Sequence, residues 1–153
     1  MRITTKGRYA LRALVNLALA GQERPIPIKI IAEEEGISPE FLEQIFFKLK
    51  KAGIINSVRG PGGGFILKQN PDEITAKAIF EAVGEGLQIT PCADNGTNAA
   101  DCARIDECLV HDVWQEASDY INGYFDDLTL RKIMNRTQQQ QETTEKAEYP
   151  IGK

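Results

Sequence analysis

Apolar residues recur at three- and four-residue intervals over the first fifty positions, and this pattern predicts three helices. The first runs from Gly7 to about Ala20, with Gly21 following as a C-cap. A short helix is expected from about Ile28 to Glu35, and a third from about Pro39 to Ala52. The buried positions expected in the last two are Ile30, Ile31 and Ala32, then Phe41, Leu42, Ile45, Phe46 and Leu49.

The link between the second and third helices has the chemistry of a tight turn. Gly36 suits the left-handed residue that ends a helix, because glycine has no Cβ to clash. Ser38 is a favourable N-cap, and Pro39 occupies the first helical position, where its missing N–H costs nothing. Two short helices separated by three residues are typical of a helix-turn-helix.

After Gly53 the pattern becomes β-rich. Residues 54–58 and 65–67 predict two strands, joined by a glycine-rich turn at 59–64. A two-stranded ribbon after a helix-turn-helix is a wing. Thr75 then caps a helix predicted over Ala76–Val83. We therefore expect residues 1–90 to form a winged helix-turn-helix DNA-binding domain in a mainly α protein.

The C-terminal half predicts one long amphipathic helix, from Leu109 to Phe125. We expect a second copy of the chain to cover it; packing on its own domain is the alternative. Thr129 caps a short helix ending near Asn135, so residues 109–135 form a dimerisation region, and 136–153 are predicted to be disordered. The expected dimerisation residues are Val110, Val113, Trp114, Ala117, Tyr120, Ile121 and Tyr124.

Charge is distributed unevenly along the chain. The net charge of −4 divides into +2 over residues 1–90 (12 basic, 10 acidic) and −6 over residues 91–153 (6 basic, 12 acidic). Four basic residues, Arg2, Lys6, Arg8 and Arg12, precede the first acid, as expected where one region meets phosphate. The chain begins without a signal peptide and contains no apolar run of about 18 residues, so we expect a cytoplasmic protein away from the membrane.

The winged region supplies groups that suit DNA. The second helix of a helix-turn-helix enters the major groove, where Gln44 can bond adenine or phosphate and Glu43 can bond the amino group of cytosine. Arg59 at the wing tip suits the minor groove. We expect basic side chains to hold phosphates and fix the register, namely Lys6, Arg8, Lys48, Lys50 and Lys51. The predicted DNA-binding residues are Arg2, Lys6, Ser38, Glu40, Glu43, Gln44, Lys48, Lys51, Ser57, Arg59 and Gly60.

All three cysteines and the only histidine lie within residues 91–111, in the order Cys92-x9-Cys102-x5-Cys108-x2-His111. An odd number of thiols in a reducing compartment disfavours a structural disulfide. Three thiolates and one imidazole make four ligands, which suit either a structural zinc ion or an iron–sulfur cluster, and the spacing leaves both open. The chain has no paired acid–base groups, so we do not expect an enzyme.

The order of these motifs resembles the Rrf2 family of bacterial transcription regulators. The matching segments are residues 6–10 (KGRYA), 41–44 (FLEQ) and 57–65 (SVRGPGGGF), and the likeness extends to about Met134. It implies a homodimer that binds palindromic promoter DNA and holds a [2Fe–2S] cluster through Cys92, Cys102, Cys108 and His111. It also implies control of iron–sulfur assembly and stress genes, the assembly machinery as cluster donor, and a place at the bacterial nucleoid.

Two details qualify this resemblance. The loop between Cys92 and Cys102 is longer than is usual in the family. Family members that hold a [4Fe–4S] cluster use an acidic ligand in the first helix, where this chain has Arg8 and Arg12; together with His111, this favours the [2Fe–2S] type. A DNA-binding protein with a structural zinc site and no sensing role is the alternative. In either case His111 lies at the start of the long helix, so one of the four predicted ligands belongs to the predicted dimerisation helix itself.

Overall fold

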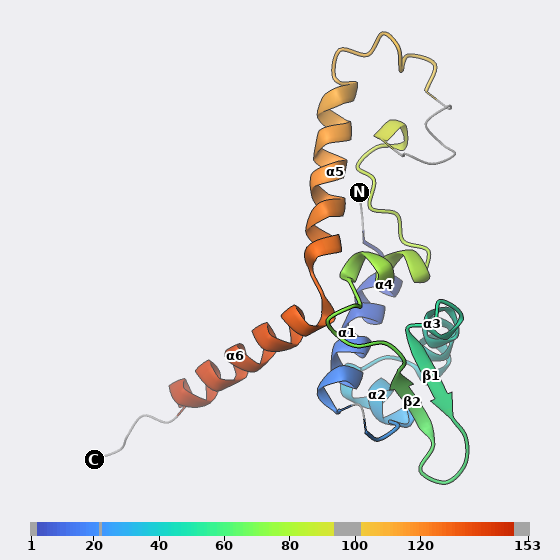
Figure 1. The fold of residues 1–153 in the computed structure, drawn as a ribbon, viewed down its shortest axis with the longest axis vertical. Helices are drawn as coiled ribbons and strands as arrows, with labels where there is room; N and C mark the ends of the chain where they lie inside the picture. The colour runs from blue at the N-terminus through green and yellow to red at the C-terminus, as the bar shows by residue number, and fades with distance from the viewer. Residues whose placement is uncertain (1–2, 22, 94–101, 149–153) are drawn as a thin grey trace.

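Alternating helical and β-rich segments fold here into a winged body from which two long helices extend (Figure 1). The computed structural model describes residues 3–21, 23–93 and 102–148. Over these residues the chain forms, in order, α1 (Thr5–Leu19), α2 (Ile28–Glu35), α3 (Pro39–Lys51), β1 (Ile55–Val58), β2 (Gly64–Leu67), α4 (Ala76–Ala82), the 3-10 helix η1 (Pro91–Ala93), α5 (His111–Asp127) and α6 (Leu130–Glu148). The mainly α, winged-helix fold expected from the sequence is confirmed.

The helix-turn-helix forms as the turn chemistry predicts. Gly36 adopts the left-handed conformation with φ of 64° at the end of α2. The Ser38 hydroxyl oxygen accepts a hydrogen bond from the Phe41 amide at 3.2 Å and so caps α3. Ile30, expected in the core, is 45% exposed, because α2 turns only Ile31 and Ala32 inward. That part of the prediction is wrong.

The core of the winged body is built by one apolar face from each of α1, α2 and α3. Its largest fully buried side chains include Leu14, Leu17, Ile31, Leu42 and Phe46. The wing extends from this core as an antiparallel ribbon in which Ile55 pairs with Leu67. The rings of Phe46 and Phe65 meet edge to face at 5.0 Å, which anchors the wing to the recognition helix α3.

A second, smaller apolar cluster lies between α4 and the two long helices. It contains Ala76, Phe80, Leu87 and Leu128, all buried. The α5–α6 junction is tied to this region by two short backbone bonds, from the Ala76 amide to the Leu128 carbonyl at 2.8 Å and from the Leu130 amide to the Ile74 carbonyl at 2.7 Å. We call this pair of bonds the junction strap.

The terminal helix is much longer than the sequence pattern predicts. Instead of ending near Asn135 before a disordered tail, α6 continues to Glu148; of the predicted tail, residues 149–153 lie outside the described part of the chain. The segment contains no glycine or proline and is rich in strong helix formers, so it stays helical without an apolar face. Buried Leu130 and Met134 anchor its first turns, and the rest projects away from the body (Figure 1).

Candidate nucleic-acid interface and cysteine segment

The outer face of α3 presents the predicted base-reading residues to solvent. Glu40, Glu43 and Gln44 are all exposed, on the side opposite the buried stripe. Phe47 lies among them, one turn beyond Glu43, and is 69% exposed. Phe47 is not among the residues predicted to bind DNA; the available signal was a large apolar side chain among the polar positions of this helix face.

The wing and α3 are joined by a polar bridge. The Lys50 ammonium donates a hydrogen bond to the Ser57 hydroxyl at 2.7 Å, across the start of β1. Both groups are exposed, as are Lys48 and Lys51 on the same helix. Arg59 and Gly60 are exposed at the loop between the strands. These predicted phosphate-binding and wing residues are therefore accessible to solvent, and the Lys50–Ser57 bond links the end of α3 to the wing.

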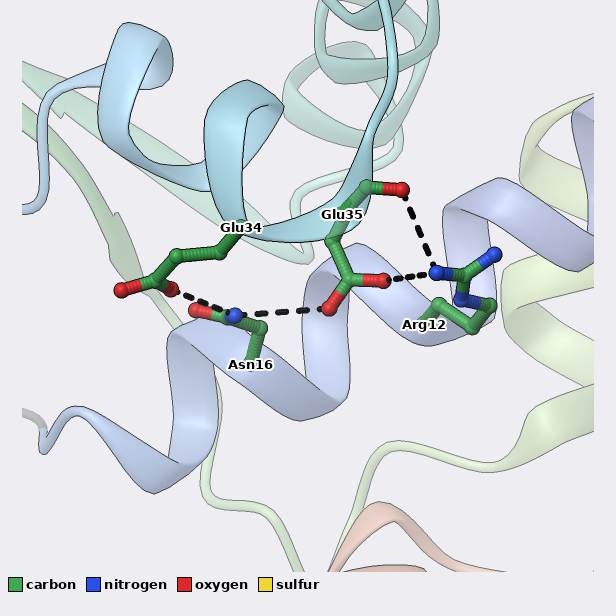
Figure 2. Close-up of polar contacts among 4 residues, drawn as sticks. All are labelled: Arg12, Asn16, Glu34 and Glu35. Atoms are coloured by element: carbon green, nitrogen blue, oxygen red, sulfur yellow. Dashed lines mark hydrogen bonds and ion pairs between the residues drawn. The ribbon is translucent and has the colours of Figure 1, made fainter.

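The N-terminal basic residues have unequal surroundings. Arg8 is exposed and Lys6 is half-buried, while Arg2 lies outside the described residues. Arg12, grouped by the sequence with the phosphate-facing arm, instead forms an ion pair with Glu35 on α2, at 2.8 Å between Nη2 and Oε2 (Figure 2). Its guanidinium also donates to the Glu35 backbone carbonyl at 3.2 Å. The charge of Arg12 is thus balanced within the protein.

These contacts belong to a polar clamp between α1 and α2. The Asn16 side-chain amide donates to the Glu34 carboxylate at 2.7 Å and to the Glu35 carboxylate at 3.3 Å (Figure 2). The clamp fixes the end of α2, immediately before the turn into the recognition helix. Arg12 also lies 5.7 Å from the centre of the Tyr9 ring, which meets Phe41 of α3 edge to face.

The three cysteines are each half-buried, and none forms a disulfide. Cys92 is in η1, which packs against α5, and its sulfur lies 3.2 Å from the Thr90 hydroxyl. Cys102 begins a run of turns. The Cys108 carbonyl accepts a bond from the His111 amide at 3.4 Å, so these two predicted ligands share a single turn at the start of α5.

His111 carries the clearest sign of a ligand site. Its Nδ1 atom is buried and has no hydrogen-bond partner among the described residues. Buried polar atoms are nearly always bonded, and an unpaired imidazole nitrogen is free to bind a metal. Three thiols and this nitrogen fit zinc or an iron–sulfur cluster as donors. The described residues do not, however, gather three such side chains at metal-binding spacing, and the loop 94–101 lies outside them.

The predicted dimerisation stripe on α5 divides between two environments. Ala117 and Ile121 are half-buried, and Ile121 packs against the second apolar cluster, so packing on the chain's own domain accounts for part of the helix. The remaining members stay exposed in this chain, up to 83% for Tyr120. They are Val110, Val113, Trp114, Tyr120 and Tyr124.

Comparisons with known proteins agree with this architecture. Residues 3–136 match the family model of Rrf2, described as an iron-dependent transcriptional regulator. The HTH-type transcriptional regulator IscR of Serratia proteamaculans (strain 568) is 42% identical over 135 residues, which cover 88% of this chain and 80% of the relative.

Solved structures give the same picture. CymR, the global cysteine regulator of B. subtilis, superimposes with a TM-score of 0.72 at 29% identity, covering 89% of this chain and 98% of CymR. T. potens IscR gives a TM-score of 0.68 at 31% identity, covering 90% and 88%. Within the described residues, no helix is both long and apolar enough to span a membrane.

These relatives are transcription regulators rather than enzymes, in agreement with the sequence prediction. A family match over most of the chain, a winged helix-turn-helix and an exposed recognition face together identify the protein as a DNA-binding regulator. The chain belongs to the Rrf2 family of transcriptional regulators.

Proposed function

We propose that this regulator binds palindromic promoter DNA as a homodimer and that a [2Fe–2S] cluster held by Cys92, Cys102, Cys108 and His111 controls its binding. The observation that carries the proposal is the buried, unpaired Nδ1 of His111 at the first residue of α5. The likeness to regulators named IscR, and the family description as iron-dependent, support a cluster over a structural zinc ion. When bound, the cluster supplies a redox-sensitive and oxidant-labile group at this helix end.

The DNA-binding half of the proposal rests on the exposed face of α3 and on the wing. Glu43 and Gln44 read base edges in the major groove, and Arg59 enters the minor groove. Phe47 lies in the middle of the same face and suits contact with a thymine methyl group. The phosphate contacts that fix this register come from Arg2, Lys6, Arg8, Ser38, Lys48, Lys51, Ser57 and the Gly60 backbone. Glu40, exposed in the first turn of α3, is the remaining residue predicted to bind DNA.

The homodimer is supported by the exposed side of α5. Four apolar or aromatic residues on α5, with Tyr120 and Trp114 among them, and Val110 directly before the helix form a surface that a second copy would cover. A two-fold dimer presents two recognition helices to two half-sites, which accounts for a palindrome. The proposed regulated genes are those of iron–sulfur assembly and related stress responses, with the assembly machinery supplying the cluster in the bacterial cytoplasm at the nucleoid.

The test is the composition and spectrum of protein purified without oxygen. We expect two iron and two sulfide per chain, with visible thiolate-to-iron absorption, and loss of all three in Cys108→Ala. Thr97→Ala, in the same segment but without a ligand atom, is the matched control. Stoichiometric zinc without sulfide would contradict the cluster and favour the structural zinc site. Footprints of loaded and cluster-free protein on promoter DNA then test control of binding.

A further inference from the structure

One buried carboxylate is not explained by the DNA-binding or cysteine residues. Glu85 follows α4 and is 7% exposed. Its carboxylate accepts hydrogen bonds from the Thr4 amide, at 3.2 Å, and from the Thr4 hydroxyl. The two residues lie 81 positions apart, so this is a tertiary contact between the end of α4 and the start of α1.

Glu85 acts as the missing cap of α1. Thr4, the N-cap residue, makes no side-chain capping bond, and no acid lies in the first turn of α1. Burial raises the pKa of Glu85, but hydrogen bonds from Thr4 and the Gly7 amide, with the charge of Lys6, outweigh burial and hold that pKa below its ordinary value. The carboxylate therefore stays charged beside the free amides at the positive end of the helix.

Gly7 makes room for this carboxylate. A Cβ atom at position 7 would lie 2.7 Å from the Glu85 Cγ, closer than real side chains approach. A buried glycine inside a helix is otherwise unfavourable, so its presence in α1 is explained by the Glu85 side chain that it accommodates. Gly7 and Glu85 thus form one structural unit.

The chain that follows Glu85 leads directly to the cysteine segment. Leu87 is buried in the second apolar cluster. The Ile89 amide donates to the Ser118 hydroxyl of α5 at 3.2 Å, and Ser118 is itself 1% exposed. Thr90 then contacts the Cys92 sulfur. A span of seven positions therefore joins the α1 cap to a predicted cluster ligand, and it is attached on the way to the helix that begins with His111.

On its other side, the cap meets the residues proposed to bind phosphate. Lys6 and Arg8 lie on the first turn of α1, beside the amides that Glu85 holds. Tyr9 follows and packs against Phe41 at the start of the recognition helix, with ring centres 6.0 Å apart. A shift of the first turn of α1 would therefore move Lys6 and Arg8 and would also disturb the contact between Tyr9 and Phe41 of α3.

We propose that Glu85 is a positioning residue for DNA binding, which couples the segment carrying Cys92 to the α1 turn carrying Lys6 and Arg8. The coupling rests on the proposed function, because it names how a change at the cysteine segment alters DNA affinity. Movement of residues 87–93 is transmitted to the Glu85 carboxylate, which changes how firmly the first turn of α1 is held against phosphate.

The first test needs no cluster and measures hydrogen exchange at the Thr4 and Gly7 amides of the apo protein. We expect exchange to be about tenfold faster in Glu85→Ala than in the wild type, since a charge-assisted bond is lost. Glu85→Gln should be intermediate, because its amide oxygen accepts a bond without the charge. Glu81→Gln, an exposed change on the same helix α4, is the control. Unchanged exchange in Glu85→Ala overturns the cap.

The second test compares the affinities of loaded and cluster-free protein for one DNA fragment, selected from a random pool by the loaded wild type. In Glu85→Gln and Gly7→Ala we expect the ratio of the two affinities to fall to within about twofold of 1, while Glu81→Gln keeps the wild-type ratio. A purely structural role predicts equal losses in both forms and an unchanged ratio, which overturns the coupling alone.

The two proposals fail in different ways. If the wild type itself binds with the same affinity in both forms, cluster control is wrong and the coupling with it. If the wild-type ratio is large and survives in Glu85→Gln, cluster control stands and the coupling is wrong. Thermal unfolding of each variant establishes that it is folded. If Glu85→Ala does not fold, the conservative Glu85→Gln replaces it in the hydrogen-exchange test.

Discussion

The winged body (residues 3–90) and the cysteine segment (residues 91–111) are built in contrasting ways. The winged body closes around fully buried side chains from four helices, α1 to α4, and from strand β1. Among the described residues of the cysteine segment only Ala93 is buried, and Leu109 is 99% exposed. A region without a core has little stability of its own, so its order depends on its attachments and on any group it binds. The winged body is thus held by its own core, while the described residues of the cysteine segment depend on contacts such as that of η1 with α5.

Removing a core ring should give the largest effect on this contrast. Phe46→Ala is expected to lower the free energy of unfolding by about 3–5 kcal/mol, because it leaves a cavity at the Phe65 contact. The measurement is chemical denaturation of the apo protein followed by circular dichroism. Trp114→Ala is the matched change outside the body. A loss from Trp114→Ala that grows with protein concentration would show a second copy covering α5, whereas equal losses in both variants would contradict the comparison.

A change at the wing should affect DNA affinity without affecting the fold. Arg59→Ala is expected to weaken binding by about 1–3 kcal/mol, since it removes a cation from the narrow groove. Fluorescence anisotropy at physiological salt measures this loss. Arg136→Ala, an exposed arginine on α6, is the control and should bind as the wild type does. Equal affinity of Arg59→Ala and the wild type would remove the wing from the interface.

The smallest expected effect is a pH dependence that originates at the α1 cap. The folded pKa of Glu85 lies below its unfolded value, so its stabilisation is complete above the unfolded pKa of about 4.3 and is lost as the pH falls through the folded pKa. The stability of the wild type should therefore approach that of Glu85→Gln in acid. Denaturation midpoints of both proteins between neutral and acidic pH measure this. A constant difference would show that the carboxylate is not held charged by Thr4 and Lys6.

Local chemistry explains which parts of the fold were predictable. The turn at Gly36 and the caps at Ser38 and Thr75 depend on neighbouring residues, and all three form as predicted. The length of α6 was missed because its helix lacks the apolar period used to recognise one. An amphipathic pattern also does not specify which neighbour covers an apolar face. The sequence therefore did not distinguish Ile121, which packs against the second apolar cluster, from Tyr120, which stays exposed.

The parts of the candidate site that the sequence did not reveal depend on tertiary contacts. The sequence alone groups Arg12 with the basic residues expected to face phosphate, because it does not show that Arg12 pairs with Glu35. Likewise, no sequence pattern links Glu85 to Thr4. The clustering of Cys92, Cys102, Cys108 and His111 was visible from the sequence as a candidate ligand set. The unpaired Nδ1 of His111 adds to it a property that only a folded chain can have.

The junction strap fixes the C-terminal end of α5 to the winged body, so a displacement at the other end of the helix becomes a rotation about the strap. The helix has 17 residues, so at about 1.5 Å per residue it is roughly 25 Å long, with His111 at its first position and the strap residue Leu128 directly after its last. On this geometry a shift of about 2 Å at His111 corresponds to a swing of only about 5° at the strap. A displacement of a few atoms at His111 would therefore reach the winged body as a small rotation rather than as a large displacement.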